Sequence, residues 1–165
     1  MSIAKFNKWQ SLDGVTRNAV LQVVQASSST QEAITSLTLQ PSGLSGTITP
    51  TSATSKILVL VDQVMYVVKN ADVGLGAGFS LFRGDTEIHK TRQNASGPSE
   101  FSVNPAFSII NRQSIIYLDS PGTTDEITYS TKGGINDTAN NQTLYFQLSG
   151  TVNPTSYITL MEIAQ

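Results

Sequence analysis

Hydrophobic and polar residues alternate in short runs along most of this chain, and clusters of Gly, Pro, Asn and Ser separate the runs. Val, Ile, Thr, Tyr and Phe dominate the runs, as is typical of an all-β sandwich or barrel. We expect strands at Ala19–Gln25, Ala33–Leu39, Gly46–Thr49, Lys56–Val68, Gly78–Phe82, Thr86–Thr91, Ala106–Ile110, Ser114–Leu118, Glu126–Thr131, Gln142–Ser149 and Ser156–Ile163. About eight strands form an antiparallel jelly-roll sandwich.

Two of these runs show the alternation of a sheet with one wet face. Leu144, Phe146 and Leu148 share one face of their run, and Ile127 and Tyr129 share one face of theirs. The residues between them are more polar, which predicts strands that bury one side and expose the other.

Other runs are apolar on both faces. In Lys56–Val68, Ile57 and Val59 lie on one face, whereas Leu58 and Leu60 lie on the other. The first and last runs repeat this pattern, and a two-layer sandwich has only one shared interior. We therefore expect the second face to be covered by further copies of the chain. The residues expected at this interface are Val20, Val24, Leu58, Leu60, Tyr66, Tyr157 and Met161.

The free energy at stake favours such an assembly. Burying one large aliphatic side chain is worth about 1.5 to 3 kcal/mol, so several wet ones would forfeit a sum comparable to the net stability of a domain, about 5 to 15 kcal/mol. The alternative is that long loops of the same chain cover the second face.

The run LFRGDTEIH contains the tripeptide Arg83-Gly84-Asp85, which some proteins use in adhesion. Glycine tolerates the positive φ that a tight turn requires, so Gly84-Asp85 is expected to be the two-residue turn of a hairpin. This turn would present Arg83 and Asp85 as exposed contact residues, with adhesion as the less favoured interpretation.

The segment before residue 17 departs from the β pattern. Phe6, Trp9 and Leu12 recur three residues apart, as on one stripe of a short helix that could not be stable alone. We expect two units, a terminal segment at residues 1–16 and a sandwich domain at residues 17–165. The segment either packs back on its own domain or docks on a larger partner through its aromatic side chains.

Composition excludes several classes of function. The formal net charge of −2 provides no cationic surface for phosphates, so nucleic acid is not an expected partner. The longest strictly apolar run, ILVLV, is far shorter than the roughly 18 residues of a membrane span, so no membrane insertion is expected. The chain has no cysteine, which excludes disulfides and thiolate metal sites.

Residues for catalysis are few. His89 is the only histidine, and no GxSxG motif marks a nucleophile. Asp119, Asp125 and Glu126 flank a loop that could hold calcium, but Asp119-Ser120-Pro121-Gly122 has the composition of a turn. We expect no enzyme, no cofactor and no metal site. A hydrolase of surface polysaccharide that used His89 or the Asp119 and Asp125 pair is the alternative.

Six segments carry a resemblance to a known family. They are AVLQVVQ, SKILVLV, LFRGDTEI, YLDSPGTTDEITY, TLYFQLSG and YITLMEIA, and they span about residues 17–165. This order resembles that of small knob-like structural proteins of tailed bacteriophages, especially cyanobacterial and marine phages. The heads of those proteins look like the tumour-necrosis-factor and complement-globular-head jelly roll.

The resemblance implies a homotrimer around a central axis, lined by the first, central and last strands. It also implies a virion protein of the capsid-decoration, knob or tail-fibre type, located in the virion and, during assembly, in the host cytoplasm. Its expected partners are other copies and other virion proteins, on which Phe6, Trp9 and Leu12 would dock. The alternative is a carbohydrate-recognition module for host-surface glycans.

Overall fold

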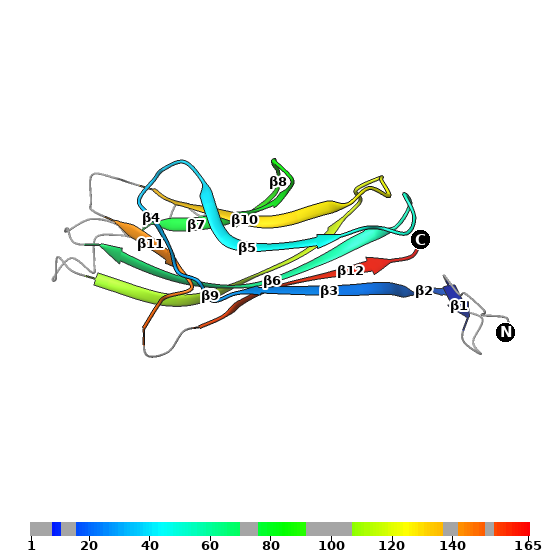
Figure 1. Cartoon of the computed structure of the whole chain (residues 1–165), viewed down its shortest axis with the longest axis horizontal. Helices are drawn as coiled ribbons and strands as arrows, with labels where there is room; N and C mark the ends of the chain where they lie inside the picture. Colours follow the sequence, from blue (N-terminus) through cyan, green and yellow to red (C-terminus); the bar gives the residue numbers. More distant parts are fainter. Residues whose placement is uncertain (1–7, 11–15, 70–75, 92–106, 137–141, 151–153) are drawn as a thin grey trace.

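The chain folds as two packed antiparallel sheets. The computed structural model describes residues 8–10, 16–69, 76–91, 107–136, 142–150 and 154–165 (Figure 1). All its regular elements are strands: β1 (Lys8–Gln10), β2 (Thr16–Asn18), β3 (Val20–Ser28), β4 (Glu32–Ile34), β5 (Gln40–Ile48), β6 (Lys56–Lys69), β7 (Ala77–Arg83), β8 (Thr86–Lys90), β9 (Phe107–Asp119), β10 (Ile127–Ile135), β11 (Thr143–Phe146) and β12 (Ser156–Ile163). The sequence-based expectation of an all-β sandwich is confirmed.

The strands after β2 form nested antiparallel pairs. β3 pairs with β12, β4 with β11, β5 with β10, β6 with β9 and β7 with β8. The first half of the chain therefore lies beside the second half in reverse order, and the innermost pair closes at the turn between Arg83 and Thr86.

Further pairings join these ribbons into two sheets. One sheet has four strands in the order β5-β10-β7-β8. In the other, β12 and β11 follow one another along one edge of β6, and β9 takes the opposite edge. β3 lies outside β12 and β4 outside β11, which gives six strands. Figure 1 shows the two sheets as separate layers.

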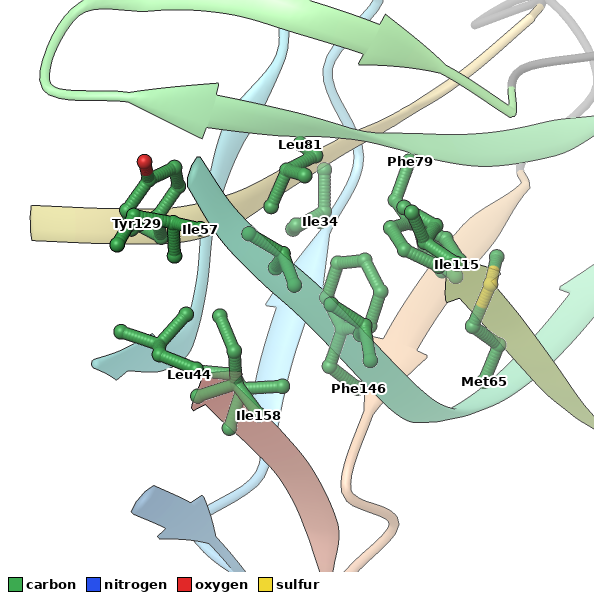
Figure 2. Packing of buried hydrophobic residues seen from close by; sticks show 14 of the residues in the cluster. Ile34, Leu44, Ile57, Met65, Phe79, Leu81, Ile115, Tyr129, Phe146 and Ile158 are labelled. Atoms are coloured by element: carbon green, nitrogen blue, oxygen red, sulfur yellow. The ribbon is translucent and has the colours of Figure 1, made fainter. Parts of the chain in front are cut away.

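The hydrophobic core fills the space between the layers. The apolar odd-numbered residues of β6, including Ile57 and Met65, contribute to it from one sheet, and Leu81 and Tyr129 contribute from the other (Figure 2). Phe79 and Phe146 meet edge to face, with ring centroids 6.3 Å apart. This geometry suits the charge distribution of aromatic rings.

Strand positions differ from the sequence-based expectation in several places. β5 begins at Gln40 rather than at Gly46, and β10 continues to Ile135, past the expected end at Thr131. β9 is one strand of 13 residues where two shorter ones were expected. Its polar centre, Asn111-Arg112-Gln113, is tolerated because among the described residues β9 pairs only with β6 and is an edge strand. β4 is shorter than expected and ends at Ile34, and β11 ends at Phe146.

The amino-terminal segment also differs from the expectation. Lys8–Gln10 is a strand that pairs with Thr16–Asn18, so the expected helical stripe is wrong at Trp9, which lies opposite Arg17. Phe6 and Leu12 lie outside the described residues. The β1–β2 hairpin lies beyond the end of the sandwich, in line with β3 (Figure 1).

Candidate functional site

The side of the six-stranded sheet that faces away from the core carries many exposed apolar side chains, and we call this side the outer face. Strand registers place residues from β3, β12, β6 and β9 side by side in straight rows. The first row is Val23–Met161–Leu58–Leu118, and the second is Gln25–Thr159–Leu60–Ile116. Directly opposed side chains touch across strands, so each row is a contiguous strip.

Exposure of the outer face is high for side chains of this type. The exposed fractions are 76% for Ile116, 61% for Ile110, 56% for Val23 and 50% for Leu118. Covering a half-exposed side chain of this size is worth about 1 kcal/mol, so covering all four is worth about 4 kcal/mol. Contiguous exposed apolar surface of this kind marks an interaction site more often than it marks a bare surface.

A second apolar cluster lies toward the other end of β6. Tyr66 faces Tyr145 of β11 on one side and Ile110 of β9 on the other. The rings of Tyr66 and Tyr145 are 5.8 Å apart and tilted by 31°. These residues extend the outer face along the length of β6.

Polar groups separate the two clusters. Asp62 forms an ion pair with Arg112, and the other guanidinium nitrogen of Arg112 donates to the Thr155 carbonyl oxygen at 2.9 Å. Beside this ion pair lies a hollow of about 390 Å³, lined by Gln25, Leu60, Val61, Asp62, Ser114, Ile115, Ile116, Tyr157 and Thr159.

Most of the interface residues expected from the sequence lie on this face. Leu58, Leu60, Tyr66, Tyr157 and Met161 occupy the outer positions of β6 and β12. Val20 also reaches the outer face, because a bulge at the end of the β3–β12 ladder pairs it with Ile163. A bulge inserts one extra residue and so shifts the alternation.

The placement of Val24 corrects the expectation. Val24 pairs with the buried Leu160 and packs against the core, whereas its neighbour Val23 is on the outer face. The expected alternation of β3 holds at Val20 and fails at Val24, after the bulge, because apolar residues on both faces of a short run do not show which face is buried.

The Arg83-Gly84-Asp85 segment forms the expected hairpin turn between β7 and β8. Gly84 has φ of +56°, in the left-handed region that glycine adopts without strain. The Asp85 side chain is fully exposed, and the Lys132 ammonium lies 3.6 Å from its carboxylate.

Arg83 differs from an exposed contact residue. Its guanidinium donates to both carboxylate oxygens of Asp119, at 3.1 and 2.9 Å, and about a third of the side chain is exposed. The buried Tyr129 hydroxyl donates to the same carboxylate at 2.7 Å. These three residues form a clamp between the sheets, and this clamp restrains the side chain that an adhesive tripeptide would present.

Burial and hydrogen bonding shift the pKa of two groups. Burial, and then the hydrogen bond to Asp119, raise the pKa of Tyr129 well above its usual value. Burial of the Glu162 carboxyl acts to raise its pKa, but the hydrogen bonds from Gln22 and Thr51 outweigh burial and lower it below 4.5. The Tyr129 hydroxyl and the Glu162 carboxyl therefore have structural roles, because each is enclosed by its hydrogen-bond partners.

The remaining candidates for chemistry are dispersed. His89 packs its ring against Tyr117, with centroids 5.5 Å apart. Asp119 belongs to the clamp, whereas Asp125 is exposed and accepts a hydrogen bond from Thr123. Among the described residues, no three His, Cys, Asp or Glu side chains gather as metal ligands, and no helix could cross a membrane.

Sequence reasoning missed two features. Ile110, Ile116 and Leu118 were not assigned to the interface, although the run Ser114–Leu118 has apolar residues on both faces, the same signal that identified β6.

A buried polar network was also missed. Gln63 donates to Ser156 at 3.0 Å and accepts from Thr131 at 2.8 Å, and the Gln147 amide, suitably oriented, accepts from Gln63 at 2.7 Å. No local sequence pattern predicts that these polar side chains, which lie far apart in the chain, come together.

Neither a known protein-family model nor a curated protein sequence matches this chain.

Proposed function

We propose that this chain is a non-enzymatic structural protein that works as a self-assembled unit, with the outer face buried between copies. The observation that carries the proposal is the exposed apolar surface of the six-stranded sheet, centred on Ile116. Regular strands hold this surface in place, so it keeps its shape without a partner and another copy can pack against it without rearrangement.

The chemistry of the outer face favours another copy of the same chain as the partner that covers it. Of the strand residues on this face, only Lys56, Asp62 and Arg112 are charged, and two of them pair with each other. Few charges would therefore have to be buried when identical copies meet. Depletion of charge and a high apolar content are typical of the interfaces of permanent homo-oligomers.

The nested strand pairs support a jelly roll of the tumour-necrosis-factor type. A jelly roll has eight strands in two sheets, and it forms when a long antiparallel ribbon folds over. Here the long strands β3, β5, β6 and β7 pair in order with β12, β10, β9 and β8. This order fits the trimeric head that the sequence resemblance implies, with β3, β12 and β6 toward the central axis.

The same resemblance suggests a place for the assembly in a phage virion, as a capsid-decoration protein, a knob or part of a tail fibre. The β1–β2 hairpin extends beyond the sandwich, which suits attachment to another virion protein (Figure 1). The β7–β8 turn, with Asp85 fully exposed, would be among the loops that face outward.

A carbohydrate-recognition module remains as a second candidate because of the hollow on the outer face. Tyr157 presents an aromatic side chain there, beside the polar groups of Asp62 and Gln25. Apolar pockets with a few polar groups are common ligand sites. Glycan-array binding that is lost in Tyr157→Ala would favour this function over self-assembly.

The proposal is tested by measuring mass in solution. Sedimentation equilibrium of the wild type is expected to give an oligomer, and the resemblance specifies three copies. Ile116→Asp places a carboxylate at the most exposed apolar position and is expected to weaken assembly at least tenfold. Ser45→Asp, at an exposed position of the four-stranded sheet, is the matched control and should assemble normally.

A monomeric wild type at all concentrations would contradict self-assembly. The virion role has a separate test, in which antibodies against this chain label purified phage particles. Particles that lack the chain would exclude a virion component and leave the assembly result intact.

A further inference from the structure

One ion pair interrupts the apolar outer face. Asp62 lies in the middle of β6 and Arg112 in the middle of β9, between the cluster around Ile116 and the cluster around Tyr66. Asp62 faces Ser114 across the ladder and Arg112 faces Val64, so the pair is diagonal. The sheet therefore presents apolar, polar and apolar zones in succession along β6.

Arg112 is held at both ends of its guanidinium. One nitrogen contacts the Asp62 carboxylate, and the other donates to the Thr155 carbonyl oxygen just before β12. The side chains of Arg112 and Asp62 are 47% and 43% exposed. In a lone subunit water reaches both charges, so the pair adds little to stability.

We propose that the Asp62–Arg112 pair fixes the register and the number of copies in the assembly. This inference rests on the proposed function, because it requires the outer face to be buried between copies. Apolar rows attract one another without direction and tolerate sliding or a different number of neighbours. A charge pair tolerates such shifts less well, because each change of register gives the two charges different neighbours.

The physical reason is desolvation. When the outer face is buried, both charges lose water, and the loss is offset only where the ion pair stays intact and its remaining polar atoms find partners. An arrangement that places Asp62 or Arg112 against an apolar row of another copy leaves a buried charge uncompensated. Buried polar residues set register and oligomeric state in this way in coiled coils.

The hollow beside the pair supplies room for such partners. Asp62, Ser114 and Tyr157 line it with polar atoms, whereas Leu60 and Ile116 form apolar walls. A side chain from a neighbouring copy can reach the Asp62 carboxylate there without displacing strand residues.

The test compares three variants of the full chain by native mass spectrometry and sedimentation. Arg112→Glu sets two carboxylates side by side and is expected to weaken assembly at least tenfold. The exchanged variant, Asp62→Arg with Arg112→Asp, can form the pair again and should recover the wild-type copy number. Asp62→Leu with Arg112→Leu should assemble at least as tightly as the wild type, but as a mixture of copy numbers.

Controls separate assembly from folding. Lys90→Glu reverses the charge in the exposed Glu87–Lys90 pair of β8, on the other sheet, and should leave assembly unchanged. Far-ultraviolet circular dichroism at high dilution should show the same strand content in every variant, because both charged side chains are half-exposed.

Two outcomes would overturn the inference while the proposed function stands. In the first, Arg112→Glu assembles with the wild-type dissociation constant and copy number. In the second, the double leucine variant forms one species with the wild-type copy number, which would place the determinant of register elsewhere. A wild type that never assembles would instead overturn the proposed function and this inference together.

Discussion

Asp119 joins the two sheets through its carboxylate. It ends β9 in the six-stranded sheet, and it accepts hydrogen bonds from Arg83 and Tyr129 of the four-stranded sheet. Hydrogen bonds to a charged group that is largely buried are stronger than those between neutral groups. Asp119, which the sequence pattern places at a turn, is therefore a structural contact between the two sheets.

Asp119→Asn is expected to lower the free energy of unfolding by about 2 kcal/mol, because the charged acceptor shared by two donors is lost. Urea unfolding measures the effect. Asp125→Asn is the matched control, since Asp125 is exposed, and it should change stability by about 0.5 kcal/mol or less. Equal stability of the two variants would show that the clamp does not stabilise the fold.

Glu162 is a buried carboxylate that holds the segment between β5 and β6. Its oxygens accept from the backbone amide and hydroxyl of Thr51, both at 2.8 Å, and from Gln22 at 2.7 Å. These bonds lower the pKa of Glu162 below 4.5, so their contribution to stability is present above that pH and is lost as the pH falls through the folded-state pKa.

Wild-type stability is therefore expected to fall as the pH drops below 4.5, and Glu162→Gln should flatten this acid limb because it has no proton to gain. Thermal unfolding between pH 3 and pH 6, about one pH unit or more either side of the ordinary glutamate pKa, would measure the slope. Glu126→Gln, at an exposed position, should keep the wild-type slope. An unchanged slope in Glu162→Gln would rule out this carboxyl as its source.

At the scale of elements, the close approach of β10 and β11 depends on a glycine. A Cβ at Gly133 would collide with the Phe146 ring and lie 2.9 Å from the Gly78 carbonyl oxygen. The absence of a side chain on β10 thus lets a large aromatic ring from the other sheet pack against the backbone.

Gly133→Ala is expected to destabilise the fold by about 1 to 3 kcal/mol through overpacking, measured by urea unfolding. Adding Phe146→Leu removes the ring that the new methyl group meets, so the double variant should lose less than the sum of the two single losses. Strictly additive losses would contradict the contact. Thr128→Ala, at an exposed position of the same strand, is the control.

At the scale of the whole molecule, self-assembly through the outer face links stability to concentration. Each tenfold rise in protein concentration stabilises an associating chain by up to about 1.4 kcal/mol, which corresponds to about 3 °C in Tm for a chain of this size. Calorimetry over a hundredfold range should show this rise in the wild type. Ile116→Asp should show a smaller rise over the same range because it assembles more weakly, whereas a concentration-independent Tm in the wild type would contradict assembly.

Local patterns were sufficient for much of the fold. Strands β3, β6, β7, β8 and β12 lie close to their expected positions, because runs of β-branched and aromatic residues end at glycine, proline and polar turns. The turn at Gly84 was equally predictable from its residue types. The candidate site was predictable in part, since β6 needs burial on both faces whatever its partners are.

The expectations that differed concern residues whose environment is set by distant segments. Val23 and Val24 have nearly the same propensity, and only the register with Met161 and Leu160 decides which of them faces outward. Arg83 lies 36 positions from Asp119 in the chain, so sequence proximity could not disclose their ion pair. Trp9 is in a strand because β2 supplies its hydrogen-bonding partner.

The sequence by itself determined the strand content, the main hairpin turn and the excess of apolar strand faces, because each follows from the preferences of residues and the two-residue period of a strand. Only the tertiary structure decided which of these faces gather on one sheet, where the clamp closes and where the Asp62–Arg112 pair lies among the apolar rows. Those features depend on pairing between segments far apart in the chain. The stability of each pair depends on both segments, so neither segment alone predicts it.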